Sequence, residues 1–253
     1  MRWLCFLLFA SPALAQGGGG GGGRPPKGLR FDLTALPVTR DSFLFFVDHT
    51  EQGFAVWQYE VRKADAGEQV VYTQYSELEP LEEEEQRVVL DRNSGRPVSF
   101  FYHLEMFSPE SDTILVEVTF DVKNGAVEGR RSASVKAGGT RTVPVRRPLP
   151  QDAVLASYEL FAAAVTNAAP GEKLSVPAYR ETRDSLGTLT MAAGQPMSIT
   201  VPAGTYHVLP LTSGDFRLYV TRTAPRRVIK GETTDGRFSF ELAGSAAVVP
   251  SNP

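Results

Sequence analysis

The histidines are the side chains of this sequence best suited to acid–base chemistry near neutral pH. His103 and Glu105 are two residues apart, so they would share one face of a β-strand, and a carboxylate beside an imidazole starts many general acid–base arrangements. A half-exposed strand face is the simpler interpretation of this pair. His49 and His207 have no second histidine at a metal-ligand offset, so we expect no metal site, and His207 is expected to be an ordinary residue of an edge-facing strand.

The sequence lacks the local motifs that usually mark catalysis. No serine lies in a Gly-x-Ser-x-Gly elbow, no His-Glu-x-x-His pair occurs, and no phosphate- or dinucleotide-binding glycine loop opens a helix after a strand. We therefore expect a non-enzymatic protein with no catalytic residue and no cofactor. A hydrolase whose site is assembled from residues far apart in the sequence remains an alternative.

Charged residues occur in clusters that could attract a partner of opposite charge. An acidic run comprises Glu77, Glu79 and Glu82 to Glu85 around Pro80, and because like charges repel and stay hydrated we expect it to be a solvated loop. Basic clusters would grip an anionic head group or, as we expect, keep edge strands soluble. These clusters are Arg130-Arg131, Arg141, Arg146-Arg147 and Arg226-Arg227.

Aromatic residues recur on the faces of several predicted strands and on the predicted helix. A concave surface built from such rings would hold an acyl chain, whereas a plain core packed against the helix is the alternative. The residues expected to line an apolar ligand site are Trp57, Tyr59, Phe100, Tyr102, Phe120, Tyr158 and Phe161.

Alternation of apolar and polar residues dominates the chain and predicts β-strands. From Ile114 to Val122 every second residue is apolar, and Asn124-Gly125 follows, which is typical of a tight hairpin. One segment departs from this period, because Val154, Tyr158, Phe161 and Val165 recur at helical spacing. The pattern predicts a helix over 152–168, capped by Asp152 and stopped by Pro170-Gly171. The expected fold is mainly β, a curved antiparallel sheet (half-barrel) wrapped around one central α-helix.

The ends of the chain differ in composition from its middle. Residues 1–15 have a basic start, a short apolar run and small residues before a cleavage point, which predicts a secretory signal peptide. Residues 16–26 predict a flexible Gly/Pro-rich segment, 27–244 a single β-rich domain, and 245–253 a disordered tail. We therefore expect an exported protein, periplasmic or secreted.

Composition excludes several partners and chemistries. Cys5 lies inside the predicted signal, so the expected mature chain has no thiol for disulfides, nucleophilic catalysis or zinc. The formal net charge of -3 gives no excess of positive charge for nucleic acid. The apolar run near the start is far shorter than the roughly 20 residues of a membrane span, so no span is expected.

Short motifs near the C-terminus carry a resemblance to a known group. The segments Val201 to Tyr206 ("VPAGTY"), Phe216 to Val220, Pro225 to Ile229 and Gly236 to Leu242 resemble the end of a family of exported bacterial proteins of unknown function. That family resembles lipoprotein-carrier (LolA-like) half-barrels, and the match covers the C-terminal quarter. The resemblance implies a curved sheet around a helix, an envelope location, no catalytic residue, and binding of lipid or lipoprotein acyl chains between sheet and helix.

Three hypotheses follow. The first is a non-enzymatic envelope protein that binds a lipid or other apolar ligand, or a partner's apolar segment, between the sheet and the helix. The second is a structural or assembly protein of the envelope that offers sheet edges or surface to a protein partner. The third is the hydrolase, which requires His103 or His207 in a cleft with a carboxylate and a hydroxyl within reach.

Overall fold

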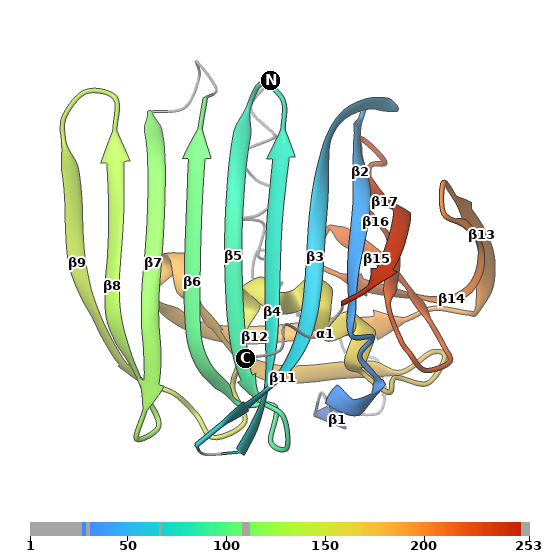
Figure 1. Ribbon diagram of the computed structural model, residues 1–253, viewed down its shortest axis with the longest axis horizontal. Coiled ribbons are helices and arrows are strands. Elements are labelled where there is room, and N and C mark those ends of the chain that lie inside the picture. Colours follow the sequence, from blue (N-terminus) through green and yellow to red (C-terminus); the bar gives the residue numbers. More distant parts are fainter. Residues whose placement is uncertain (1–26, 29–30, 66, 108–111, 249–253) are drawn as a thin grey trace, which may run out of the picture.

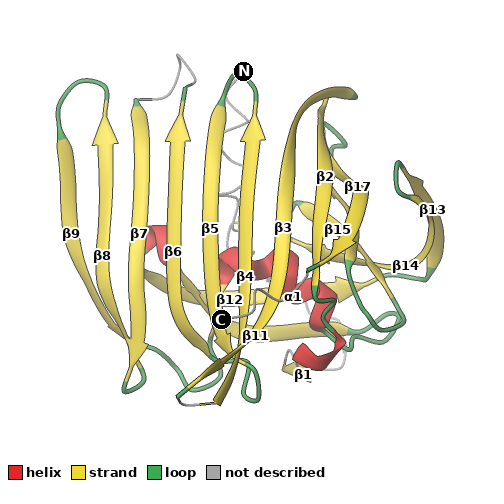
Figure 2. Cartoon of the chain, in the orientation of Figure 1, coloured by secondary structure: helices red, strands yellow, loops and turns green. Residues whose placement is uncertain are grey.

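A computed structural model describes residues 27–28, 31–65, 67–107 and 112–248. Within these residues the chain is mainly β, and Figure 1 and Figure 2 show long strands with a few short helical segments. The predicted signal peptide (1–15), the predicted flexible segment (16–26) and residues 249–253 of the predicted tail lie outside the described residues.

The first part of the chain builds a broad meander in which each strand pairs with the next along the sequence. Its strands stand side by side in Figure 1 and pair antiparallel, as the alternating pattern predicts. They are β2 (Thr39–Val47), β3 (Thr50–Ala64), β4 (Gly67–Leu78), β5 (Glu82–Asp91), β6 (Pro97–Met106), β7 (Thr113–Lys123), β8 (Ala126–Val135) and β9 (Thr140–Pro148).

The remaining strands continue the same sheet, because the last strand, β17, pairs antiparallel with β2. The described residues thus form one 17-stranded sheet in the order β1-β10-β11-β12-β13-β14-β15-β16-β17-β2-β3-β4-β5-β6-β7-β8-β9. The added strands are β1 (Lys27–Gly28), β10 (Val154–Leu155), β11 (Lys173–Arg180), β12 (Ser185–Ala193), β13 (Met197–Val201), β14 (Gly204–Ser213), β15 (Phe216–Thr221), β16 (Val228–Thr233) and β17 (Phe238–Ala247).

One α-helix, α1 (Glu159–Val165), is present among the described residues, together with the 3-10 helices η2 (Leu33–Ala35), η3 (Ala156–Tyr158) and η4 (Glu181–Arg183). Figure 1 shows α1 behind β3 to β5, with β11 and β12 crossing behind the meander. Phe161 of α1 stacks on Tyr72 of β4 at 5.5 Å, and α1 also lies against β15 and β16. The sheet therefore curves so that two of its regions enclose the helix, which confirms the prediction of one large curved sheet and one helix. The predicted antiparallel pairing is wrong at one edge, where β1 and β10 pair in parallel with β11, and the half-barrel stays a prediction.

The predicted turn chemistry is confirmed at the best hairpin signal. Asn124 and Gly125 join β7 to β8 with φ angles of 51° and 74°, the positive values that this tight hairpin requires and that these two residue types tolerate. Because the turn fixes the register, Val116, Val118 and Phe120 are all buried on one face of β7.

The helix is shorter than the sequence pattern predicts, and the N-cap expected at Asp152 is wrong. Val154 and Leu155 pair in parallel with Ala178 and Tyr179 of β11, which ends helical geometry on the N-terminal side. The apolar residues spaced over 152–168 are nevertheless buried, because the short strand β10, the 3-10 helix η3 and the helix α1 each bury the apolar residues that they contain.

The C-terminal boundary expected at Gly244 is also wrong. Strand β17 continues through Ser245 to Ala247, where it pairs with Asp41 to Thr39 of β2. Ser245 donates a hydrogen bond to the buried carboxylate of Asp41 at 2.6 Å, and Arg227 approaches the same carboxylate at 3.4 Å. These residues therefore belong to the sheet, although their small and unpatterned composition favoured a tail.

Gly129→Ala is expected to lower the free energy of unfolding by about 1–3 kcal/mol, the usual cost of overpacking. Gly129 pairs with Phe120, and a Cβ there would lie 2.1 Å from the carbonyl oxygen of Thr119. The backbone cannot give way without disturbing the β7–β8 ladder. Urea unfolding should compare this variant with Gly138→Ala, where a Cβ meets nothing within 4 Å. Equal losses in the two variants would contradict the steric explanation.

Candidate functional site

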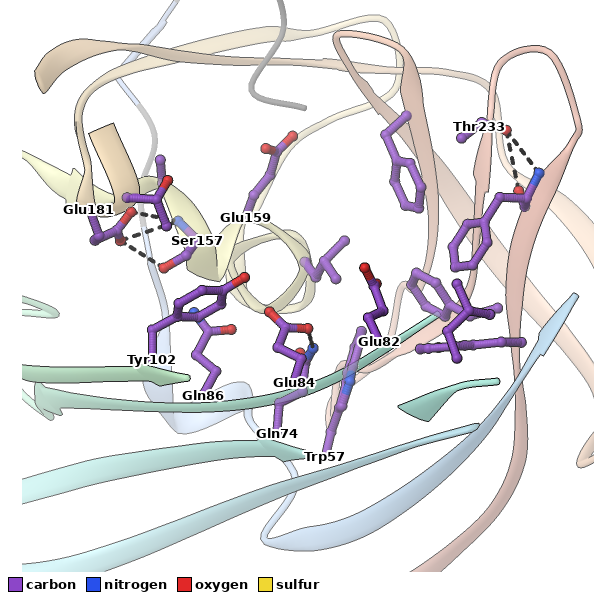
Figure 3. A pocket seen from close by; sticks show the side chains of 18 of the residues that line it. Trp57, Gln74, Glu82, Glu84, Gln86, Tyr102, Ser157, Glu159, Glu181 and Thr233 are labelled. Carbon is purple, nitrogen blue, oxygen red and sulfur yellow. Dashed lines mark hydrogen bonds between the residues drawn. The ribbon is translucent and has the colours of Figure 1, made fainter. Parts of the chain in front are cut away.

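A cavity of about 130 Å³ lies between the inner face of the sheet and the beginning of α1. It is comparable in size to an engineered cavity of about 150 Å³ that holds benzene. Figure 3 shows side chains converging on it from the meander, from α1 and from the C-terminal strands. The residues that line it include Phe45, Trp57, Glu82, Glu84, Gln86, Tyr102, Ser157, Glu159, Arg180, Glu181, Phe216, Phe238 and Phe240.

Strand β5 places two carboxyl groups on this inner face. Glu82, Glu84 and Gln86 alternate with outward residues and continue the phase of Val88 and Leu90, all of them buried. The interpretation of the acidic run as a solvated loop is therefore wrong over the β5 segment. Strand pairing with β4 and β6 overrides the repulsion of like charges, because every second side chain must point inward.

The carboxyl group of Glu84 is held by side chains of the neighbouring strand. Gln74 donates a hydrogen bond to its Oε2 atom at 2.9 Å, and Ser76 donates to the same oxygen at 3.2 Å. Tyr72 in turn donates to Oε1 of Gln74 at 2.7 Å, so the group is positioned by a short polar chain along β4. These bonds fix the carboxyl at the wall of the cavity.

Burial disfavours the charged form of both β5 carboxyl groups. Burial raises the pKa of Glu82 to about 7. Burial, with the nearby charge of Glu82 as the second cause, raises the pKa of Glu84 to about 8, although the bonds from Ser76 and Gln74 oppose the shift. Both groups therefore titrate close to neutral pH.

The opposite wall is formed around the start of α1. Glu181 of η4 is 2% exposed and accepts hydrogen bonds from the backbone N–H of Ser157 at 3.2 Å and from its Oγ at 2.7 Å. Burial raises the pKa of Glu181 to about 7. Burial likewise raises the pKa of Glu159 to about 7, while the charge of Arg180 opposes the shift, and the residue keeps partial solvent exposure.

An aromatic wall completes the cavity. Trp57 of β3 packs against Phe240 of β17 with ring centroids 5.3 Å apart, and Phe45 packs edge-on against Phe238 at 5.4 Å. Phe216 of β15 stacks on Phe240 at 5.9 Å. The cavity thus has an apolar side contributed by the C-terminal strands and β2–β3, and an acidic side contributed by β5, α1 and η4.

Three buried hydrogen-bond donors at this cavity have no partner. The indole Nε1 of Trp57, the amide Nε2 of Gln86 and the hydroxyl of Tyr102 are each without a hydrogen-bonding atom in the part of the chain that the structure describes. All three residues line the cavity and are at most 3% exposed. A buried donor left unpaired costs about 1–3 kcal/mol, so an acceptor that reached any of these groups would stabilise the folded protein.

The aromatic residues predicted to line an apolar ligand site are all buried, but most of them lie in the core. Trp57 and Tyr102 line the cavity. The others pack against neighbouring rings: Tyr59 and Tyr158 contact Phe161, and Phe100 stacks on Phe120 at 5.1 Å. Sequence reasoning identified the residue types on the inner face, and the structure divides them between core and cavity.

None of the histidines lines the cavity. His103 lies on the outer face of β6, where its ring approaches Glu105 at 3.7 Å and Glu117 at 3.4 Å, and its side chain is partly exposed, as the simpler interpretation expected. His49 and His207 are exposed. No group of three or more potential metal ligands occurs in the described ranges. The arrangement that the hydrolase hypothesis required is therefore not found at this cavity.

Several arginines predicted to keep edge strands soluble instead connect elements. Arg147 of β9 pairs with Asp184 at 2.8 Å, Arg226 donates to the carbonyl oxygen of Thr166, and Arg227 reaches Asp41. Arg130, Arg141 and Arg146 are exposed as expected. Among the described residues no helix is long and apolar enough to cross a membrane.

The comparisons with known proteins give little guidance. No protein-family model matches the sequence, and no curated protein is significantly similar to it. Among solved structures, the chain is similar to a Bacteroides fragilis protein assigned to exported proteins and to a YMCC-like fold, with a TM-score of 0.32 and 8% identity. This match covers 83% of this chain and 96% of that chain.

A TM-score this low transfers neither a fold nor a function. The resemblance to lipoprotein-carrier half-barrels therefore stays a prediction.

The acidic residues of the cavity were missed by sequence reasoning, although a signal for two of them exists. The alternation from Val88 and Leu90 backwards along β5 places Glu82 and Glu84 on the buried face. Glu159 and Glu181 carry no comparable signal, because η4 and the start of α1 meet only in the folded chain.

Proposed function

We propose that this protein is a non-enzymatic binding module that holds a compact amphipathic ligand between the sheet and α1. The observation that carries the proposal is the set of three unpartnered buried donors, Trp57 Nε1, Gln86 Nε2 and the Tyr102 hydroxyl, on residues that line a cavity that is aromatic on one side and acidic on the other. Such a combination of apolar surface and a few polar groups is typical of small-molecule sites.

The size of the cavity favours a ligand built on about one ring over a long acyl chain. At about 130 Å³ it matches a single aromatic ring, whereas a lipid chain needs a longer channel. The aromatic rings that would have extended the channel, such as Tyr59 and Phe161, contact each other instead. The lipid expected from the resemblance is therefore replaced in this proposal by a smaller ligand with polar groups.

The proposal includes an exported location, periplasmic or secreted. Its support is the N-terminal sequence, where residues 1–15 have the composition of a secretory signal.

Three ring probes of matched shape test whether the cavity binds ligands. Phenylethanolamine, styrene glycol and mandelate share a phenyl ring and a hydroxyl group and differ only in the ammonium, hydroxyl or carboxylate group beside it. We expect at least one of them to shift the indole N–H resonance of Trp57 saturably in an NMR titration of the full chain, because that donor would gain an acceptor.

The Trp57 resonance is assigned by its loss in Trp57→Phe. The side-chain amide resonance of Gln86 is assigned by its loss in Gln86→Leu. If the same probe shifts this resonance and that of Trp57 saturably, the probe binds in the cavity. Absence of a saturable shift at Trp57 for all three probes would overturn the proposed function.

A further inference from the structure

Carboxyl groups outnumber cationic groups at the cavity. Arg180 is the single lysine or arginine among the lining residues, whereas five of them carry a carboxyl group: Glu82, Glu84, Glu159, Glu181 and Asp215. The positive charge of Arg180 opposes the rise that burial causes in the pKa of Glu159, so the guanidinium already acts on that carboxyl. The carboxyl groups of β5 have no cation opposite them in the described chain.

Glu82 is the acid whose raised pKa has burial as its one cause. Its side chain is buried and lines the cavity, and no charged or hydrogen-bonding group opposes that shift. Glu84, by contrast, accepts bonds from Gln74 and Ser76, and Glu181 accepts bonds from Ser157. In Figure 3, Glu82 and Glu84 point from β5 into the space below α1. A buried carboxylate without a partner is costly, so the ionised form of Glu82 favours a positive group beside it.

We propose that the ligand of this cavity presents a protonated amine to Glu82 and Glu84. This inference rests on the proposed function and adds the chemical class of the ligand. The ammonium group would donate to the carboxyl of Glu82, while an acceptor beside it would take the N–H of Trp57 or Gln86. The aromatic wall formed by Trp57 and Phe240 would contribute a cation–π attraction as well as apolar contact.

A hydroxylated ligand would satisfy the same hydrogen bonds but would leave the acidic side uncompensated. Every ionised carboxyl at the cavity would then remain in a poorly solvated position, which is the state that burial already disfavours. An anionic ligand would add repulsion from Glu82, Glu84 and Glu181. The charge distribution therefore selects the amine among ligands of equal shape.

Binding of an amine is expected to release protons and to strengthen as the pH rises. The titratable and charged groups that face Glu82 and Glu84 from the surrounding elements also affect this pH dependence. They are Tyr102 of β6, Glu159 of α1, Arg180 of β11, Glu181 of η4 and Asp215 between β14 and β15. Because burial raises the pKa of Glu82 to about 7 and that of Glu84 to about 8, both groups become anionic between mildly acidic and mildly alkaline pH.

The same three probes test the charge class of the ligand. By isothermal titration calorimetry with the full chain at about pH 8, we expect phenylethanolamine to bind at least about tenfold more tightly than styrene glycol, with mandelate weakest. At about pH 5.5 the advantage of the amine should fall to about threefold or less, because the carboxyl groups are protonated.

Two single variants test whether the preference for the amine arises at the β5 carboxyl groups. Glu82→Gln should lower the affinity for phenylethanolamine about tenfold and leave that for styrene glycol within about twofold. Glu85→Gln removes the same charge from the outer, exposed side of β5 and should change neither affinity. Binding of styrene glycol or mandelate at least as tightly as the amine would overturn this inference and leave the proposed function standing. Binding of none of the three would overturn both.

Discussion

Phe161→Ala is expected to lower the free energy of unfolding by about 3–5 kcal/mol, the usual cost of removing a buried aromatic side chain. Phe161 is 0% exposed and contacts three rings: Tyr72 at 5.5 Å, Tyr59 at 5.8 Å and Tyr158 at 5.3 Å. Its loss would leave a cavity between α1 and the sheet that these rings cannot close. Urea unfolding followed by circular dichroism measures the change.

Phe54→Ala provides the matched control. Phe54 is 38% exposed on the outer face of β3 and contacts only the ring of Tyr75 among the described aromatic residues. Its removal should cost less than about 1 kcal/mol. If Phe161→Ala cost no more than this control, the aromatic set between α1 and β3–β4 would be a ligand surface and not the core.

The parts of the fold that follow from local pattern were predictable. The alternation along β7 and the Asn124-Gly125 turn specify a strand, its inward face and its register, because side-chain period and turn geometry are both local properties. The helical spacing over 152–168 correctly indicated buried residues. It did not specify one helix, because pairing of Val154 with β11 is a contact between residues distant in sequence.

The cavity itself was not predictable from the sequence. Its walls come from β2–β6, α1, β11, η4 and the C-terminal strands, so its composition depends on how the sheet curves. Like charges stay hydrated where the backbone leaves each side chain able to turn toward solvent. In β5 the ladder to β4 and β6 removes that freedom, and Glu82 and Glu84 are buried while Glu85 is exposed. The alternation of the strand, and not the charge of the side chains, therefore decides which of these glutamates are buried.

Glu84→Gln is expected to make the protein more stable at about pH 8.5, by on the order of 3 kcal/mol, and to have little effect at about pH 4.5. Burial raises the pKa of Glu84 to about 8, so the folded protein holds this proton more tightly than the unfolded chain does. The stability from this proton is fully present below the ordinary carboxyl pKa of 4.5 and is lost as the pH rises toward 8. Urea unfolding of wild type and variant across this range measures the difference.

The amide keeps the geometry of the site while removing the charge. A glutamine at this position still offers an oxygen to Gln74 and Ser76, which donate to Glu84 at 2.9 and 3.2 Å. Glu85→Gln, on the exposed side of the same strand, should leave the pH dependence unchanged and so separates burial from net charge.

Lower stability of Glu84→Gln at both pH values would instead mean that the ionised carboxylate is the form the fold requires. The expected result has a consequence for binding, because an amine that pairs with Glu82 and Glu84 should restore, at alkaline pH, the stability that their ionisation removes.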